Sequence, residues 1–150
     1  MKSIIITAVT MFFICFANAQ TGSVPIAKIQ KLLDKVEGQK YVNLMGREEK
    51  ITKQEITENT YTFNYTGLGK YGSKWVQEST NIEWDKGFTH YSSTGYGNDK
   101  ITICSFKFKN ELNWYMHVKD ETGSPKSTRK SLEFFILTKD YPEFKALIKQ

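Results

Sequence analysis

The chain has 150 residues, long enough for one domain, with 21 Lys and Arg residues against 16 Asp and Glu residues and a formal net charge of +5. The positive excess is mild and spread along the sequence, and only Arg47 and Arg129 are arginines. Recognition of phosphate and bases favours the planar fork of arginine. Composition therefore argues against a nucleic-acid-binding protein.

The segment 1–19 has the form of a secretory signal peptide. A lysine near the start precedes an apolar run over residues 4–16, and Ala17 and Ala19 place small side chains where a signal peptidase cleaves. The run is shorter than the roughly 20 apolar residues of a spanning helix. We expect cleavage after Ala19, export to the periplasm or the medium, and a single mature domain over residues 20–150 without a membrane span.

The two cysteines have different expected fates. Cys15 lies in the signal segment, and the bulky Phe13 and Ile14 before it disfavour lipid attachment. Cys104 alone remains after cleavage, so the mature chain can form no intramolecular disulfide. Cys104 alternates with Phe106 in a predicted strand, which favours a buried core position over a catalytic thiolate.

A helix is predicted at the start of the mature domain. Ser23 is a candidate N-cap, and Pro25 falls in the first turn, where a missing N–H costs nothing. Gly38 is placed to end the helix. Apolar residues follow at helical spacing, at Ile26, Ile29, Leu32, Leu33 and Val36. One side of this helix must lie against an apolar partner.

From Tyr41 onwards, short runs of β-branched and aromatic residues alternate with polar residues, which predicts strands. The connections 85–87 and 109–111 are short enough to predict hairpins between neighbouring strands. The basic cluster 125–130 is expected to be a solvated loop before the last strand. The candidate strands span residues 41–45, 50–57, 60–66, 74–84, 88–93, 100–108, 112–118 and 132–138.

A short C-terminal helix completes the predicted order. Asp140 and Glu143 have the spacing of a capping box, and Phe144, Leu147 and Ile148 give the helix an apolar side. This order predicts an α+β domain, in which the N-terminal helix packs on a curled antiparallel meander of about six to eight strands. The alternative is a closed eight-stranded up-and-down barrel with the helices as lids. Either shape leaves a concave, aromatic-lined cavity.

Two loops rich in Gly and Tyr are candidate surfaces for a partner. Residues 67–72 match G-x-G-x-x-G, but a strand is predicted to follow instead of the helix that a dinucleotide site requires. We therefore expect a loop and no nucleotide cofactor. Residues 93–99 form the second loop, and Tyr71 and Tyr96 at the two loop tips are candidate exposed anchors. Trp75 and Trp84, which lie on a predicted strand beside polar residues, complete the set of candidate ligand- or partner-binding residues.

The sequence offers little for catalysis or metal binding. His90 and His117 are the only histidines, and no short-spaced ligand pattern surrounds them. We expect no catalytic residue, no metal and no cofactor. A hydrolase in which His90 or His117 works with a nearby carboxylate is kept as the third hypothesis.

These observations predict an exported, non-catalytic binding protein. The first hypothesis is an interaction with a protein or peptide, as made by an inhibitor, an immunity factor or a subunit of an envelope complex. The second hypothesis is a carrier that holds a small apolar or sugar ligand in the concave face of the sheet. A cavity favours the carrier, and an exposed aromatic patch favours the protein partner.

Overall fold

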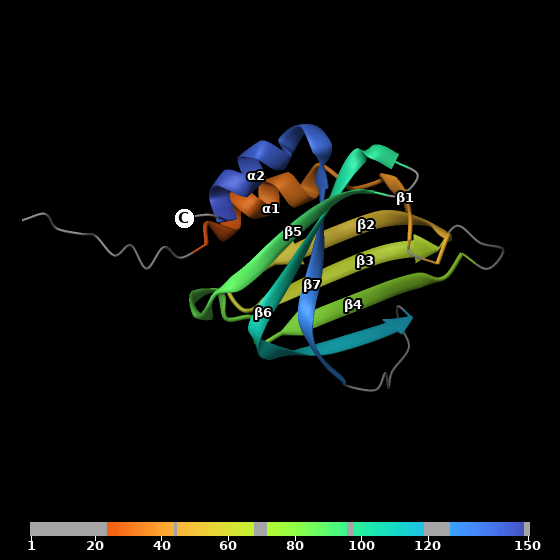
Figure 1. Cartoon of the computed structure of the whole chain (residues 1–150). Helices are drawn as coiled ribbons and strands as arrows, with labels where there is room; N and C mark the ends of the chain where they lie inside the picture. Colours follow the sequence, from red (N-terminus) through yellow and green to blue (C-terminus); the bar gives the residue numbers. More distant parts are fainter. Residues whose placement is uncertain (1–23, 44, 68–71, 96–97, 119–126, 149–150) are drawn as a thin grey trace, which may run out of the picture.

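The computed structural model describes residues 24–43, 45–67, 72–95, 98–118 and 127–148 (Figure 1). Two helices lie side by side next to a strongly curled antiparallel sheet. The helices are α1 (Ile26–Asp34) and α2 (Tyr141–Ile148), with short 3₁₀ helices at Trp84–Lys86 and Thr138–Asp140. The strands are β1 (Lys40–Val42), β2 (Glu48–Ile56), β3 (Thr60–Gly67), β4 (Lys74–Thr80), β5 (Phe88–Gly95), β6 (Asn98–Val118) and β7 (Ser127–Leu137).

The sheet is an open half-barrel, so the predicted α+β fold with a curled antiparallel sheet is confirmed. Its strands follow the order β1-β2-β3-β4-β6-β5, and β7 pairs with β6 as well. All of these pairs are antiparallel. The curl turns one face of β2, β3 and β4 inwards, and this concave face carries the aromatic residues of β3.

Strand β6 is one continuous strand of 21 residues, so the hairpin predicted at 109–111 is wrong. Its first half pairs with β5 and its second half with β4, which also rules out the predicted hairpin at 85–87. Residues 109–111, whose polar side chains suggested a turn, lie where β6 stops pairing with β5 and begins to pair with β4. There the side-chain amide of Asn110 donates to the carbonyl of Asn81 at 2.8 Å, and Asn81 donates to the carbonyl of Glu111 at 3.2 Å.

Helix α1 packs its predicted stripe against β2 and β7. Its buried residues are Ile29, Leu32 and Leu33, and Val36 is buried just beyond its end. The N-cap is Pro25, which provides no side-chain hydrogen bond, and the predicted cap Ser23 lies outside the described residues. Gly38 adopts a φ of +83°, which favours glycine, where the chain leaves the turn after the helix.

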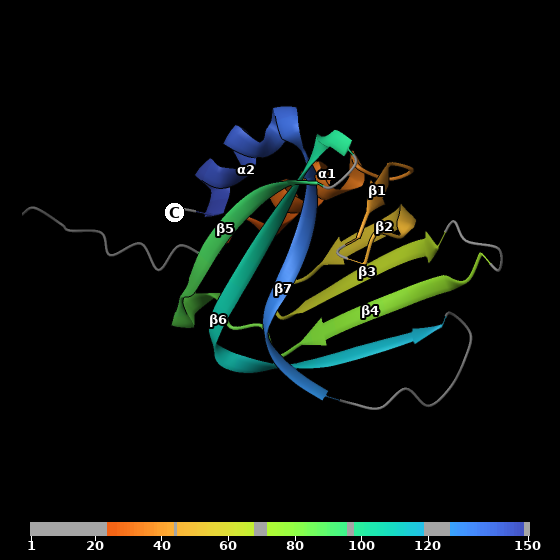
Figure 2. The same cartoon turned by 45° about the vertical axis from the view of Figure 1, so that its right-hand side comes forward.

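Strand β7 crosses the concave face of the sheet and divides the interior (Figure 2). On one side of β7, the ring of Phe134 lies 4.6 Å from Tyr61 and 6.0 Å from Phe144 of α2, centroid to centroid. On the other side, Phe135 lies 4.6 Å from Tyr41 and 4.7 Å from Phe63. The first side is the core beneath the helices, and the second side borders a cavity.

Two glutamine side chains form hydrogen bonds with backbone groups of β2 and β7 where no neighbouring strand supplies a partner. Gln54 of β2 pairs with the backbone of Phe135 in β7, donating to its carbonyl and accepting from its N–H, each at 2.9 Å. Gln30 of α1 donates to the carbonyl of Gln54 at 2.7 Å and accepts from the N–H of Ile56 at 2.8 Å. These amides fix α1 and β7 to β2. Neither helix of the described chain has the length and apolar character needed to cross a membrane.

Candidate functional site

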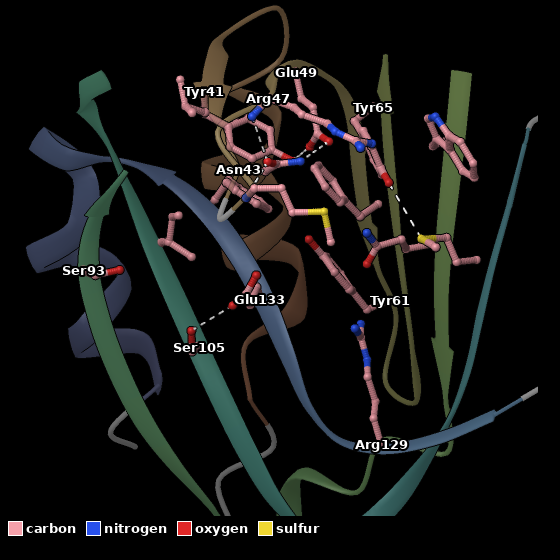
Figure 3. A pocket seen from close by; sticks show the side chains of 18 residues that line it. Tyr41, Asn43, Arg47, Glu49, Tyr61, Tyr65, Ser93, Ser105, Arg129 and Glu133 are labelled. Carbon is pink, nitrogen blue, oxygen red and sulfur yellow. Dashed lines mark hydrogen bonds between the residues drawn. The ribbon is translucent and has the colours of Figure 1, made fainter. Parts of the chain in front are cut away.

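A cavity of about 590 Å³ lies between the concave face of the sheet and strand β7 (Figure 3). This volume falls in the range of small-molecule binding sites, roughly 300–1,000 Å³. Side chains from β1 to β7 contribute to its walls. They are Tyr41, Val42, Asn43, Met45, Arg47, Glu49, Tyr61, Phe63, Tyr65, Trp75, Gln77, Ser93, Ile103, Ser105, Met116, Arg129, Glu133 and Phe135.

Aromatic rings form the main apolar wall of the cavity. The period of two along β3 places Tyr61, Phe63 and Tyr65 on its concave face, where all three are buried. Phe63 stacks on Tyr65 with centroids 5.1 Å apart, and Phe135 of β7 stacks on the same Phe63. A stacked row of this kind presents flat apolar faces that fit a flat or extended hydrophobic ligand.

A hydrogen-bonded turn forms the solvent side of the cavity. The Tyr41 hydroxyl donates to Glu49, and the Asn43 side-chain amide donates to the other oxygen of the same carboxylate at 2.7 Å. Asn43 also accepts from the backbone N–H groups of Met45 and Arg47, at 2.9 and 3.0 Å. Burial, together with the hydrogen bond to Glu49, raises the pKa of Tyr41 far above its ordinary value. The Glu49 carboxylate is therefore already engaged by donors from the protein.

Arg129 is a largely buried charged residue that lines the cavity. It starts from β7 at the lower end of the pocket, and its guanidinium points towards Tyr61 (Figure 3). Nη2 donates to Ser79 Oγ at 3.3 Å, and the guanidinium lies 4.8 Å from the ring centre of Trp114. Burial lowers the pKa of Arg129 to about 10, so the side chain stays protonated at neutral pH. Nε is buried and has no hydrogen-bond partner within the described part of the chain.

Arg129 is a site residue that the sequence analysis missed. It belongs to the basic cluster 125–130, which was predicted to be a solvated loop, but from Ser127 onwards this cluster is strand β7. Arg129 then lies on the side of β7 that also carries Glu133 and Phe135. The available signal was weak: Arg129 is one of two arginines among many lysines, at even spacing before Phe135.

The four predicted binding residues have separate locations. Trp75 lines the cavity, in register with Tyr65 across the β3–β4 pair. Trp84 does not line it. Instead, Trp84 lies in a 3₁₀ helix and meets Phe88 and Phe108 edge-on, with centroids 5.6 and 5.2 Å apart. Tyr71 and Tyr96 lie outside the described residues. Met116 and Arg129 also line the cavity, which the sequence did not reveal.

The histidines and the cysteine lie away from the cavity. The ring of His90 lies in a separate hollow between β5 and α2, with its centroid 5.1 Å from that of Phe106 and 6.1 Å from that of Tyr141. His117 lies on β6 opposite Val76. Cys104 is fully buried, and burial raises the pKa of its thiol to about 12. The described segments contain no group of three or more His, Cys, Asp or Glu side chains suited to a metal ion.

Comparison with known proteins gives no functional assignment for this site. No protein-family model, no curated protein and no solved structure matches the chain. The function must therefore be argued from the cavity itself.

Proposed function

We propose that the chain is a non-catalytic binding protein that holds a small, mainly apolar ligand in the concave face of its sheet. The aromatic-lined cavity of about 590 Å³ is the observation that supports this function. Stacking on Phe63 and Tyr65 and contact with Phe135 and Trp75 would remove the apolar surface of the ligand from water. Export, as proposed from the segment 1–19, would give the cavity access to ligands outside the cytoplasm.

The entrance to the cavity supports exchange of a ligand with solvent. Met45 is 78% exposed and Arg47 is also exposed, yet both residues line the cavity. They belong to the turn between β1 and β2, which Asn43 holds by hydrogen bonds. An apolar, adaptable methionine at the edge of a pocket suits ligands of more than one shape.

The competing hypothesis of a protein or peptide partner has less support. It relied on Tyr71 and Tyr96, which lie outside the described residues. Among the described large hydrophobic residues, those that are exposed are Met45, Tyr91 and Met116, and two of them belong to the cavity. The carrier hypothesis therefore explains more of the exposed apolar surface.

The test is to fill the cavity. Ser105 of β6 lines it and is replaced by phenylalanine, while the exposed Ser92 of β5, which does not line it, receives the same change as a control. Binding of the neutral fluorophore phenylnaphthylamine is titrated for each protein. We expect saturable binding to the wild-type chain and to Ser92→Phe, and a loss of about tenfold or more in affinity for Ser105→Phe, because a misplaced ring displaces the ligand.

Two results would contradict the proposed function. The first is no saturable binding of the neutral fluorophore to the wild-type chain. The second is equal affinity of wild type, Ser105→Phe and Ser92→Phe, which would place the fluorophore elsewhere. Thermal unfolding of all three proteins shows whether each variant is folded when its affinity is measured.

A further inference from the structure

We propose that the ligand is an amphipathic organic acid, whose anionic group binds to Arg129 while its apolar body lies against the aromatic wall. This inference rests on the proposed function and names the chemical class of the ligand. It is carried by the position of the largely buried Arg129 beside the aromatic wall of the cavity (Figure 3).

Arg129 has hydrogen-bond donors that the described residues do not use. A guanidinium offers five N–H groups in a planar fork that matches a carboxylate. Within the described residues only Ser79 Oγ accepts from it, at 3.3 Å, and the buried Nε has no partner. Nε is too buried for a ligand to reach, so an anionic ligand in the cavity would bind the terminal nitrogens of the fork through charge-assisted hydrogen bonds.

Glu133 acts on Arg129 through space and favours its charged form, but no carboxylate of the described chain forms an ion pair with Arg129. In every ion pair of the described residues, with nitrogen and oxygen within 4.0 Å, the basic partner is a lysine. Glu133 lies on the same strand but is exposed, and it accepts a hydrogen bond from Ser105 at 3.4 Å. Glu133 offsets part of the positive charge of Arg129, but the guanidinium, without an ion-pair partner, remains open to an external anion.

Arg129 is held in place before any ligand arrives. The ring of Trp114 lies 4.8 Å from the guanidinium carbon, and Ser79 binds one terminal nitrogen. Stacking on tryptophan restricts the plane of the fork and leaves its edges free for hydrogen bonds. A preorganised donor loses less conformational entropy when the ligand binds.

A cationic ligand is the opposite reading of the same cavity, since aromatic rings and carboxylates also recognise ammonium groups. The contacts favour the anion. Both oxygens of Glu49 already accept hydrogen bonds, from Tyr41 and Asn43, and Glu133 is exposed to solvent. The charged group that is largely buried and has no ion-pair partner is the guanidinium of Arg129, so the complementary ligand is an acid.

The experiment compares two fluorophores with the same rings. Anilinonaphthalene sulfonate carries an acid group, and phenylnaphthylamine is its uncharged counterpart. Both are titrated into the wild-type chain, Arg129→Met, Arg129→Lys and Lys130→Met. Lys130 is the matched control, because it is the next residue of β7, it is exposed, and its loss changes the net charge equally.

We expect the wild-type chain to bind the sulfonate about tenfold or more tightly than the neutral fluorophore, as a charge-assisted hydrogen bond would provide. Arg129→Met should abolish this preference, so that the two fluorophores bind to this variant with affinities within about threefold of each other. Lys130→Met should keep the preference, and Arg129→Lys should retain part of it because the charge remains without the fork.

Other outcomes separate this inference from the proposed function. Equal or weaker binding of the sulfonate to the wild-type chain, with the neutral fluorophore still bound in the cavity, overturns the acid and leaves the carrier. If Arg129→Met still prefers the sulfonate to the neutral fluorophore, or if Lys130→Met loses this preference, Arg129 is not the residue that binds the acid group. If Arg129→Met does not fold, the wild-type comparison and Arg129→Lys decide, because the latter keeps the charge and most of the side-chain volume.

Discussion

The side-chain amide of Gln54 forms the two hydrogen bonds of a backbone pair with Phe135, although β2 and β7 are not neighbours in the sheet. The same oxygen of Gln54 accepts from the Tyr61 hydroxyl at 2.7 Å. Gln54 is 1% exposed, so all of these groups are shielded from water. One amide therefore holds β7 across the concave face and fixes the strand that separates the core from the cavity.

Replacing Gln54 with leucine should destabilise the protein strongly. The change keeps the volume but leaves the N–H and C=O of Phe135 and the hydroxyl of Tyr61 buried without their partner. We expect a loss of about 2–5 kcal/mol in the free energy of unfolding, since each orphaned buried group costs about 1–3 kcal/mol. Urea denaturation of wild type and variant measures this loss in the free energy of unfolding.

The control for this change is Glu55→Leu, at the next and exposed position of β2. Its surface ion pair with Lys53 contributes little, so a change within about 1 kcal/mol is expected. Equal effects at positions 54 and 55 would contradict the role assigned to Gln54.

Gln30 is expected to control the attachment of α1 to the sheet. In Gln30→Leu the N–H of Ile56 and the carbonyl of Gln54 lose their partner. The amide hydrogen of Ile56 should then exchange with solvent about tenfold or more faster, in line with the loss of about 1–3 kcal/mol for unpaired backbone groups. Amide exchange followed by NMR gives the answer, with a backbone amide of β3 as the internal reference. Unchanged exchange at Ile56 would show that the helix docks without this amide.

The buried thiol predicts a loss of stability at alkaline pH. Burial raises the pKa of Cys104 from 9.0 to about 12, so between these values the folded state keeps a proton that the unfolded state releases. Stability is therefore complete below about pH 9 and should fall above it, by at most about 1.4 kcal/mol per pH unit from this group. Tyr41 and Tyr61, whose pKa values are also raised by burial, act in the same direction from about pH 10.

The contribution of Cys104 can be isolated with Cys104→Ala. The difference in the free energy of unfolding between wild type and variant should shrink as the pH rises above about 9, because the variant has no thiol to deprotonate. Chemical denaturation at a series of pH values measures this difference. A constant difference from pH 7 to 11 would exclude a raised thiol pKa in the folded state.

We expect Arg129 to contribute to ligand binding but not to the stability of the folded protein. Its guanidinium is largely buried, and no carboxylate of the described residues forms an ion pair with it. Replacing a buried, poorly compensated charge by an apolar side chain is often neutral or stabilising. Arg129→Met should therefore unfold within about 1 kcal/mol of the wild type, or be more stable. Thermal unfolding tests this, and a loss of more than about 3 kcal/mol would mark Arg129 as structural.

The sequence by itself determined the two helices and the buried faces of α1 and β3. The helical spacing of Ile29, Leu32 and Leu33 predicted the buried side of α1, and the alternation of Tyr61 and Phe63 predicted an aromatic concave face, because both patterns follow from local geometry. The short C-terminal helix was predicted for the same reason, and the curled antiparallel sheet was predicted because the apolar stripe of the first helix needs a broad apolar partner. Trp75 was recognised as a candidate because aromatic rings beside polar residues are unusual in a core.

Only the tertiary structure decided which strands meet and what lies between them. Residues 109–111 resemble a turn locally, but they continue β6 because burial of Phe108 and Leu112 on either side holds the strand in the core. The path of β7 over the concave face is set by its pairing with β6 and by the long-range bonds of Gln54, 81 residues away from Phe135. That path alone turns Arg129 from a solvated loop position into the buried cation of the cavity, since neither spacing nor composition encodes a contact between distant strands.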